Sequence, residues 1–266
     1  MGYETVKGGF PLSTKLKNQL LAASLVLLVV VFAGVSAWLD HKVQPVAARL
    51  DLPIYSVELP EGKKQIALTF DAAWGNEDTQ TLIDILDRYE VKATFFVIGQ
   101  WAEKYPESVR ALHEAGHDVM NHSYDHRHYT GLSSAEMVQD VHRASEVIRG
   151  VTGTKPNLFR PPYGDYNAAV VEAMRNAGYY TIQWDVDSLD WKDLSAAEIT
   201  RRVLDGAKNG SIVLFHNAAL HTPEALPGII EGLQSQGYEL VGVADMIYKN
   251  QYTMDHTGRQ HPLAEG

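Results

Sequence analysis

The chain has 266 residues, of which 45% are apolar, so it is long enough for one large domain with a sizeable core. It contains no cysteine, which excludes disulfides, iron–sulfur clusters and a thiol nucleophile, and restricts any metal site to histidine, aspartate and glutamate ligands. The formal net charge of −10 argues against nucleic acid as a partner or substrate.

The N-terminal part has the pattern of a membrane segment. Residues 20–39 read LLAASLVLLVVVFAGVSAWL and carry no charge, and about twenty apolar residues span a hydrocarbon core as a helix. Because lysines precede this run, we expect residues 1–19 to be cytoplasmic and residues 20–39 to be an uncleaved transmembrane anchor. A signal peptide is the alternative, since VSA (35–37) resembles a cleavage site. Both place the following residues outside the cytoplasm, held at the cell membrane or secreted.

The remainder of the chain divides into a stem, a domain and a tail. Residues 40–62 contain three prolines without long periodicity, which predicts a stem. Residues 63–250 alternate short apolar runs with helix-like stretches, and the polar residues 251–266 are expected to form a flexible tail. The apolar runs predicted to be strands are 64–70, 93–99, 117–121, 157–160, 179–184, 211–215 and 238–243.

Seven strand–helix units in succession predict an α/β fold with parallel strands and right-handed crossovers. Such strands can form an open doubly wound sheet or close into a barrel, and periodicity alone does not decide between the two.

Titratable residues follow five of the seven predicted strands at the carboxyl end, where parallel α/β folds carry their chemistry. Each residue alone has a structural explanation as a turn residue, an ion-pair partner or part of a solvated loop. Their convergence favours a common site with the parts for metal-assisted amide hydrolysis, namely imidazole ligands, a carboxylate base and a histidine acid. These residues are Asp71, His122, His126, Arg160, Asp185, Asp187, Asp190 and His216.

Five sequence blocks resemble the motifs of the polysaccharide deacetylases, the family with the NodB homology domain (carbohydrate esterase family 4). In chain order they are TFDAAWG (69–75), HSYDH (122–126), RPPYG (160–164), DSLDW (187–191) and VLFH (213–216). The resemblance spans about residues 63–245 and implies a distorted barrel of seven or eight βα units. The membrane segment and the FDAAWG block are also similar to sporulation-associated deacetylases of Gram-positive bacteria.

The resemblance implies four catalytic roles. Asp71 would be the general base that acts on a metal-bound water, and Arg160 would orient Asp71 and pair with its charge. His216 would be the general acid, and Asp190 would tune it.

The resemblance also implies contacts with metal and substrate. His122 and His126 would bind a divalent metal, expected to be zinc, while His128 has no role in the family pattern and would be plain loop. The backbone N–H of Tyr163 would help to stabilise the oxyanion, and Trp191 would line the substrate groove.

One position departs from the family pattern. The family's third metal ligand is an aspartate where this chain has Ala72, whose methyl group cannot coordinate a metal. Three outcomes remain open: Glu77 or Asp78 completes the site, Asp71 becomes a ligand itself, or metal binding is weak or absent.

These observations predict a metal-dependent hydrolase that removes N-acetyl groups from cell-wall polysaccharide of the peptidoglycan type. The expected partners are this acetylated glycan and the membrane, and the chain is expected to act as a monomer. Two alternatives are a membrane-anchored glycan-binding protein on an impaired deacetylase barrel, which Ala72 favours, and an O-acetyl esterase.

Overall fold

The computed structural model describes residues 13–15, 24 and 51–263. The predicted cytoplasmic segment 1–19, the predicted anchor 20–39 and residues 40–50 of the predicted stem therefore lie almost entirely outside the described residues. Within the part of the chain that is described, no helix is long and apolar enough to cross a membrane.

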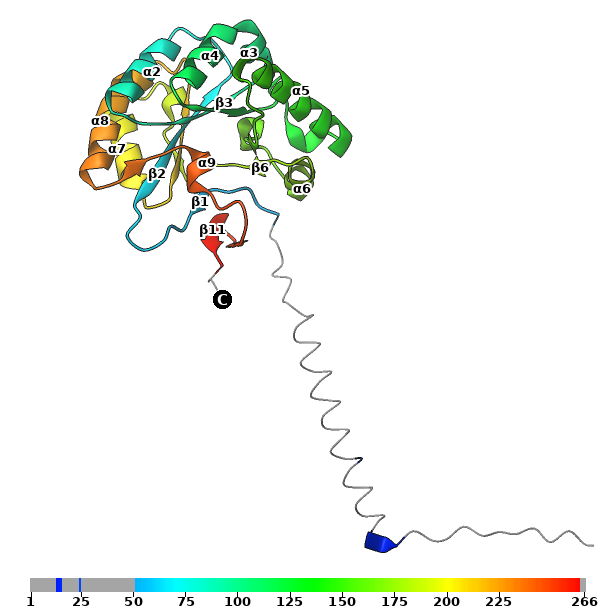
Figure 1. The fold of residues 1–266 in the computed structure, drawn as a ribbon. Helices are drawn as coiled ribbons and strands as arrows, with labels where there is room; N and C mark the ends of the chain where they lie inside the picture. The colour runs from blue at the N-terminus through cyan, green and yellow to red at the C-terminus, as the bar shows by residue number, and fades with distance from the viewer. Residues whose placement is uncertain (1–12, 16–23, 25–50, 264–266) are drawn as a thin grey trace, which may run out of the picture. The chain divides into compact units, whose positions relative to one another are not determined.

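The domain is built on one parallel sheet of eight strands, in the order β6-β5-β4-β3-β2-β8-β7, with β9 paired to β2 (Figure 1). Each of the seven predicted apolar runs overlaps one of these strands, although β2 and β8 continue past the predicted ends at 70 and 215, and β7 is an additional, two-residue strand that was not predicted. The strands are β2 (Gln65–Ala72), β3 (Thr94–Val97), β4 (Asp118–Asn121), β5 (Leu158–Phe159), β6 (Tyr180–Thr181), β7 (Val186–Asp187), β8 (Ile212–His216) and β9 (Glu239–Leu240).

The sheet is an open, curled form of the predicted barrel, with β6 and β7 as its two edges. Residues 54–57 lie between the two sides of this opening. The Ile54 N–H donates to the carbonyl of Thr181 at one side (2.8 Å), and the Val57 N–H donates to the carbonyl of Gly210 at the other (2.9 Å). This segment thus replaces part of the hydrogen bonding that a closed barrel would supply.

Strand β2 is buried along its whole length, because helices cover one face of the sheet and the curled sheet encloses the other. Successive side chains of a strand point to opposite faces. Ile66, Leu68, Phe70 and Ala72 accordingly pack into the largest apolar cluster. The alternate residues include Asp71, which faces the interior of the curl.

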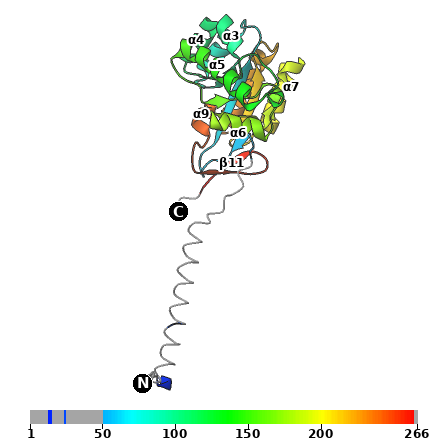
Figure 2. The same ribbon diagram turned by 90° about the vertical axis from the view of Figure 1, so that its right-hand side faces the viewer.

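Helices surround the outer side of the sheet, as the two views in Figure 1 and Figure 2 show. Two of them, α5 and α7, begin with capping boxes in which Ser133 pairs with Glu136 and Ser195 pairs with Glu198. The helices are α2 (Thr79–Arg88), α3 (Gly99–Lys104), α4 (Pro106–Glu114), α5 (Ser134–Thr152), α6 (Ala168–Asn176), α7 (Ala196–Gly206), α8 (Thr222–Ser235) and α9 (Val243–Met246), with 3-10 turns η1 (Tyr129–Gly131), η2 (Pro162–Gly164) and η3 (Asp190–Lys192).

A second, three-stranded sheet has the order β1-β11-β10 and lies at the end of the domain away from α3 and α4 (Figures 1 and 2). Its strands are β1 (Ser56–Val57), β10 (Tyr252–Met254) and β11 (Arg259–Pro262).

This small sheet corrects two predictions. Residues 252–262 form strands and not the expected flexible tail, and residues 51–62 of the expected stem pack into the domain. Gln260 is fully buried, and its side-chain amide exchanges two hydrogen bonds of 2.9 Å with the backbone of Tyr248. The polar composition hid these strands, because strand propensity reports how side chains pack on a half-buried apolar surface, which this segment lacks.

Candidate active site

The predicted site residues meet at the carboxyl ends of neighbouring strands. Asp71 at the end of β2 pairs in register with His216 at the end of β8. His122 follows β4, and its Nε2 lies 3.5 Å from Oδ2 of Asp71. Arg160 follows β5, and its Nη1 lies 2.8 Å from Oδ1 of Asp71. Residues at the ends of three other strands, β4, β5 and β8, therefore lie around the carboxylate of Asp71, as the strand-end pattern predicted.

Asp71 and Arg160 form a buried ion pair, with Arg160 fully buried and Asp71 7% exposed. Arg160 also donates to Oγ1 of Thr69 (2.9 Å) and to the carbonyl of Gln183 (3.2 Å), and its guanidinium lies 4.2 Å from the centre of the Phe96 ring. Every one of these contacts restrains the guanidinium, so its position beside Asp71 is fixed by the fold.

The environment keeps Asp71 ionised. Burial alone would raise the pKa of this carboxyl, but the electrostatic interactions with His122, Arg160 and His216, together with the hydrogen bond from Arg160, outweigh burial and hold the pKa below its usual value. Arg160 is the permanent positive charge among these neighbours. Asp71 is therefore a carboxylate at neutral pH.

His122 and His126 are both neutral imidazoles at physiological pH. Burial lowers the pKa of His122, and burial together with His122 lowers the pKa of His126 to about 4. The Nδ1–H of His122 donates to the carbonyl of Arg160 (2.8 Å), which leaves the Nε2 lone pair on the side of Asp71. The Nδ1 of His126 is buried and has no hydrogen-bond partner among the described residues.

Two buried residues that the sequence analysis did not single out hold the loop that carries these histidines. Asp140 in α5 accepts from the backbone N–H of Tyr124 (2.9 Å) and from the hydroxyl of Tyr129 (2.6 Å). Asn121 accepts from the backbone N–H of Ser123 (2.8 Å). A charged residue on the apolar face of a predicted helix was the signal that could have revealed Asp140.

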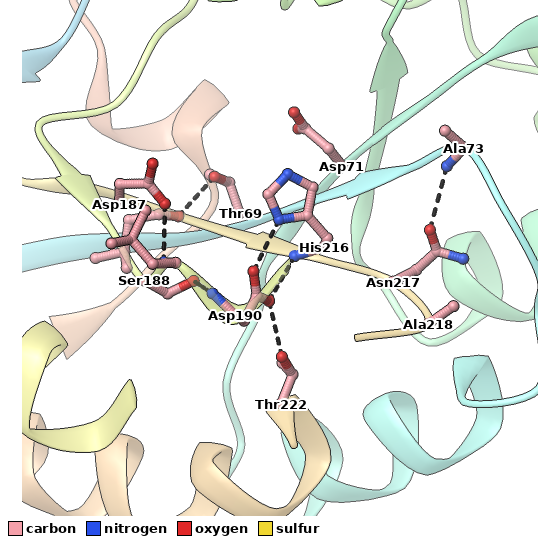
Figure 3. Close-up of polar contacts among 12 residues, drawn as sticks. Thr69, Asp71, Ala73, Asp187, Ser188, Asp190, His216, Asn217, Ala218 and Thr222 are labelled. Atoms are coloured by element: carbon pink, nitrogen blue, oxygen red, sulfur yellow. Dashed lines mark hydrogen bonds and ion pairs between the residues drawn. The ribbon is translucent and has the colours of Figure 1, made fainter. Parts of the chain in front are cut away.

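His216 is held by Asp190, which is 1% exposed (Figure 3). The two oxygens of Asp190 accept from Nδ1 of His216 (2.8 Å) and from its backbone N–H (2.8 Å). The hydroxyl of Thr222, which the sequence analysis missed, donates to the same carboxylate (2.7 Å).

This arrangement favours the protonated form of His216. Burial lowers the pKa of His216, but the hydrogen bond to Asp190 and the charges of Asp71, Asp190 and Asp187 outweigh burial and raise the pKa above its usual value. Figure 3 shows the second ring nitrogen of His216 on the side of Asp71. The proton donor, His216, and the carboxylate base, Asp71, therefore face the same part of the site.

Tyr163 and Trp191 both lie at the exposed rim of the site, with 60% and 56% of each residue accessible. Tyr163 has a φ of +60° within the RPPYG block, so its backbone occupies the left-handed region. Its ring stacks on His128 at 4.3 Å. His128, expected to be plain loop, also lies 3.3 Å from Oδ2 of Asp165 and is therefore part of the rim.

The residues present fit a metal only in part. His122 and His126 are neutral, as metal ligands must be, but no group of three or more histidine, aspartate or glutamate side chains within the described ranges is arranged to hold a metal ion. Ala72 is 1% exposed and packs in the apolar cluster. Glu77 and Asp78 bond the backbone of Asn76 and Ala218 instead. Neither Glu77 nor Asp78 therefore completes the site, and the carboxylate that lies beside the two imidazoles is that of Asp71, whose Oδ2 is 3.5 Å from Nε2 of His122.

The sequence matches a known family. A family model for polysaccharide deacetylases matches residues 58–182. The chain is 34% identical over 199 residues to a peptidoglycan-N-acetylglucosamine deacetylase of Bacillus cereus, and the aligned region covers 73% of this chain and 93% of that protein. It is 39% identical over 191 residues to the peptidoglycan-N-acetylglucosamine deacetylase PgdA of Listeria monocytogenes, and the aligned region covers 71% of this chain and 40% of PgdA. The chain thus spans less than half the length of PgdA.

The fold matches solved structures of the same kind. BA3943 of Bacillus anthracis, described as a CE4 family pseudoenzyme, superimposes with a TM-score of 0.70 at 34% identity, over 74% of this chain and 69% of that chain. A mutant of BA3943 with the same TM-score and identity is described as having restored enzymatic activity. A structure of this type can therefore carry either an inactive or an active site.

Proposed function

Since the chain belongs to the polysaccharide deacetylase family, we propose that it hydrolyses the N-acetyl groups of cell-wall polysaccharide of the peptidoglycan type. The observation that carries the proposal is the pairing of two supported catalytic groups on adjacent strands. Asp71 is charged and held by Arg160, while His216 is held by Asp190, and the two meet in register between β2 and β8. The relatives named above as peptidoglycan deacetylases support the choice of substrate.

In the proposed reaction, the carboxylate of Asp71 accepts a proton from a water that attacks the acetamide carbonyl carbon. The carbon–nitrogen bond then breaks, and the protonated His216 donates its proton to the departing amine. The products are acetate and a free amino sugar. Arg160 keeps Asp71 ionised and oriented, and Asp190 keeps His216 in its protonated, acid-competent form.

Tyr163 and Trp191 are proposed to act on the substrate side. The backbone N–H of Tyr163 would donate to the oxyanion that forms on the acetamide oxygen. The exposed indole of Trp191, one residue after Asp190, would line the groove beside the leaving amine.

A divalent metal such as zinc would find two donors in this chain, His122 and His126. Because neither Glu77 nor Asp78 supplies a third side chain and Asp71 is already paired with Arg160, we expect the native chain to bind zinc weakly. An aspartate at position 72 would have to turn from the apolar cluster toward the histidines. Zinc should therefore stabilise Ala72→Asp against unfolding more than it stabilises the native chain.

The test is acetate release by the purified full chain from peptidoglycan and from an acetylated glucosamine polymer, with and without zinc. We expect release by the native chain, loss of at least about a hundredfold in Asp71→Asn, and a gain in Ala72→Asp. Thermal unfolding with added zinc reads out metal binding independently of activity. If neither the native chain nor Ala72→Asp releases acetate from either polymer, the chain is not a deacetylase.

A second candidate function is glycan binding without hydrolysis. Ala72 in place of a metal ligand favours it, as does the similarity to a protein described as a pseudoenzyme. A binding protein would retain its affinity for acetylated glycan in Asp71→Asn and His126→Ala and would release no acetate in any variant. Hydrolysis of O-acetyl esters uses the same acid and base, so acetate release from acetylated xylan in parallel distinguishes that reaction.

We also propose that the domain acts outside the cytoplasm, attached to the membrane through residues 20–39, and that the protein serves in sporulation. The uncharged run and the lysines before it support the topology, and the FDAAWG block supports the role. Protease treatment of intact cells tests the first proposal, since an extracytoplasmic domain is cleaved without lysis. Expression confined to growing, non-sporulating cells would contradict the second.

A further inference from the structure

The loop after β2 presents the indole of Trp74 to solvent. Trp74 is 63% exposed, although tryptophan is among the residues that gain most from burial. Among the large apolar residues in the described part of the chain, only Leu220, at 70%, is more exposed. An aromatic side chain left open at the rim of a site is a common feature of ligand-binding surfaces.

The fold holds this loop in one conformation. The side-chain amide of Asn217 accepts from the Ala73 N–H (3.1 Å) and donates to the carbonyls of Trp74 and Gly75 (Figure 3 shows the first of these bonds). The indole N–H of Trp101 in α3 donates to the same Gly75 carbonyl. Asn217, directly after β8, and Trp101 in α3 thus fix the backbone on both sides of Trp74.

Gly75 makes the turn possible. Its φ is +57°, and a Cβ at this position would lie 2.5 Å from Oε2 of Glu77 and 3.3 Å from the Cβ of Ala218. Only glycine fits such a backbone without displacing its neighbours. The exposed position of the indole is therefore built into the turn and the amide bonds beneath it.

Trp74 continues an aromatic row along the rim of the candidate site. Its ring meets His126 edge-on at 4.9 Å, His126 meets Tyr163 at 4.4 Å, and Tyr163 stacks on His128 at 4.3 Å. The row follows the carboxyl ends of β2, β4 and β5. By strand order, Trp191 lies on the other side of β8 from Trp74. By strand order, aromatic side chains thus follow strands on both sides of β8, which carries His216.

We propose that Trp74 is a stacking platform for a pyranose ring next to the sugar whose acetamide is cleaved, so that the site selects oligomers over single sugars. This inference rests on the proposed function. The apolar C–H face of a pyranose complements the flat indole, and a rigid aromatic ring loses little conformational entropy on binding. Since 1.4 kcal/mol corresponds to a tenfold change, an aromatic contact of this size is expected to contribute about tenfold in affinity.

The experiment compares Trp74→Ala and Trp74→Phe with Leu263→Ala, a matched control that removes another exposed apolar side chain (51%) in the C-terminal segment. Acetate release is measured on N-acetylglucosamine, which has no neighbouring ring, and on a chito-hexasaccharide. Trp74→Ala should lower kcat/KM for the hexasaccharide about tenfold through KM and leave the slow release from the single sugar unchanged. Trp74→Phe should retain most of the preference, and Leu263→Ala all of it. Equal losses on both substrates would overturn the inference.

Binding separates this inference from the proposed activity. The affinity of the full chain for the hexasaccharide is measured in the Asp71→Asn background by calorimetry, with and without Trp74→Ala. A loss of about tenfold supports the platform even if no variant releases acetate. Equal affinity with and without the indole, or no binding of the hexasaccharide at all, overturns it. A change in oligomeric state of Trp74→Ala would assign the indole to a contact between copies and would also overturn it.

Discussion

Replacing Arg160 with methionine tests how far the stability of this domain depends on the ion pair inside its candidate active site. The substitution keeps a long apolar stem beside Phe96 but removes the guanidinium. Three hydrogen bonds are lost, to Asp71 (2.8 Å), to Thr69 (2.9 Å) and to the carbonyl of Gln183 (3.2 Å). What remains is a carboxylate that is 7% exposed and has lost its permanent counter-charge.

The expected cost follows from that unpaired charge. Removing one partner of a buried ion pair costs about 3–5 kcal/mol, a large part of the roughly 5–15 kcal/mol by which a typical domain is stable. For a domain of this size, each kcal/mol lowers the unfolding temperature by about 2–4 °C, so we expect a decrease of roughly 6–20 °C. Arg110→Met is the control, because Arg110 pairs with Glu107 on the surface of α4 and should cost less than about 1 kcal/mol.

The dependence on pH identifies Asp71 as the source of the loss. Burial would raise the pKa of Asp71, but the interactions with His122, Arg160 and His216 lower it below the usual aspartate value of 3.8. A lowered pKa means that the ion pair stabilises the fold above this value and ceases to do so as the pH falls through the lower folded value. The difference between the native chain and Arg160→Met should therefore be largest near neutral pH and should shrink in acid.

Thermal and urea unfolding of the native chain, Arg160→Met, Asp71→Asn and the double variant complete the test. Because Asn at position 71 removes the buried charge, the double variant should be more stable than the two single losses predict, by about 1–3 kcal/mol. Strict additivity, or a cost for Arg160→Met no larger than that of Arg110→Met, would refute the view that the ion pair supports the fold.

Two further substitutions test other parts of the structure. Burial lowers the pKa of His216 and the hydrogen bond to Asp190 raises it, so Asp190→Asn should lower this pKa. The basic limb of the pH–rate profile should then shift to lower pH, and the rate should fall about 10–100-fold. A basic limb at the same pH in Asp190→Asn would contradict the role of Asp190. A Cβ at Gly210 would lie 1.7 Å from the carbonyl oxygen of Val57, so Gly210→Ala should cost about 4 kcal/mol or more in urea unfolding. Gly153→Ala, at a φ of +74° in open space, should cost only about 1 kcal/mol, and equal costs would show that the close approach is unimportant.

The sequence by itself determined the class of the fold and the membership of the site. A buried parallel strand must be apolar along its length, so runs such as 64–70 and 211–215 were recognisable as strands. Because parallel strands share one carboxyl edge, residues that follow different strands had to gather there. That rule by itself predicts Asp71, Arg160 and His216 in one site, although Asp71 and Arg160 are 89 residues apart.

Tertiary structure alone decided how those groups are supported and what they lack. Several supporting contacts depend on partners distant in the chain. They are the hydrogen bonds of Asp140 to the histidine loop, the hydrogen bond from Thr222 to Asp190, and the pairing of the strands within residues 252–262. Local periodicity reports which side chains are buried, but not which polar atoms meet after burial. The candidate metal site shows the same limit of sequence patterns. Ala72 was visible in the sequence as a missing ligand, whereas only the fold shows that Glu77 and Asp78 bond backbone groups and do not replace that ligand.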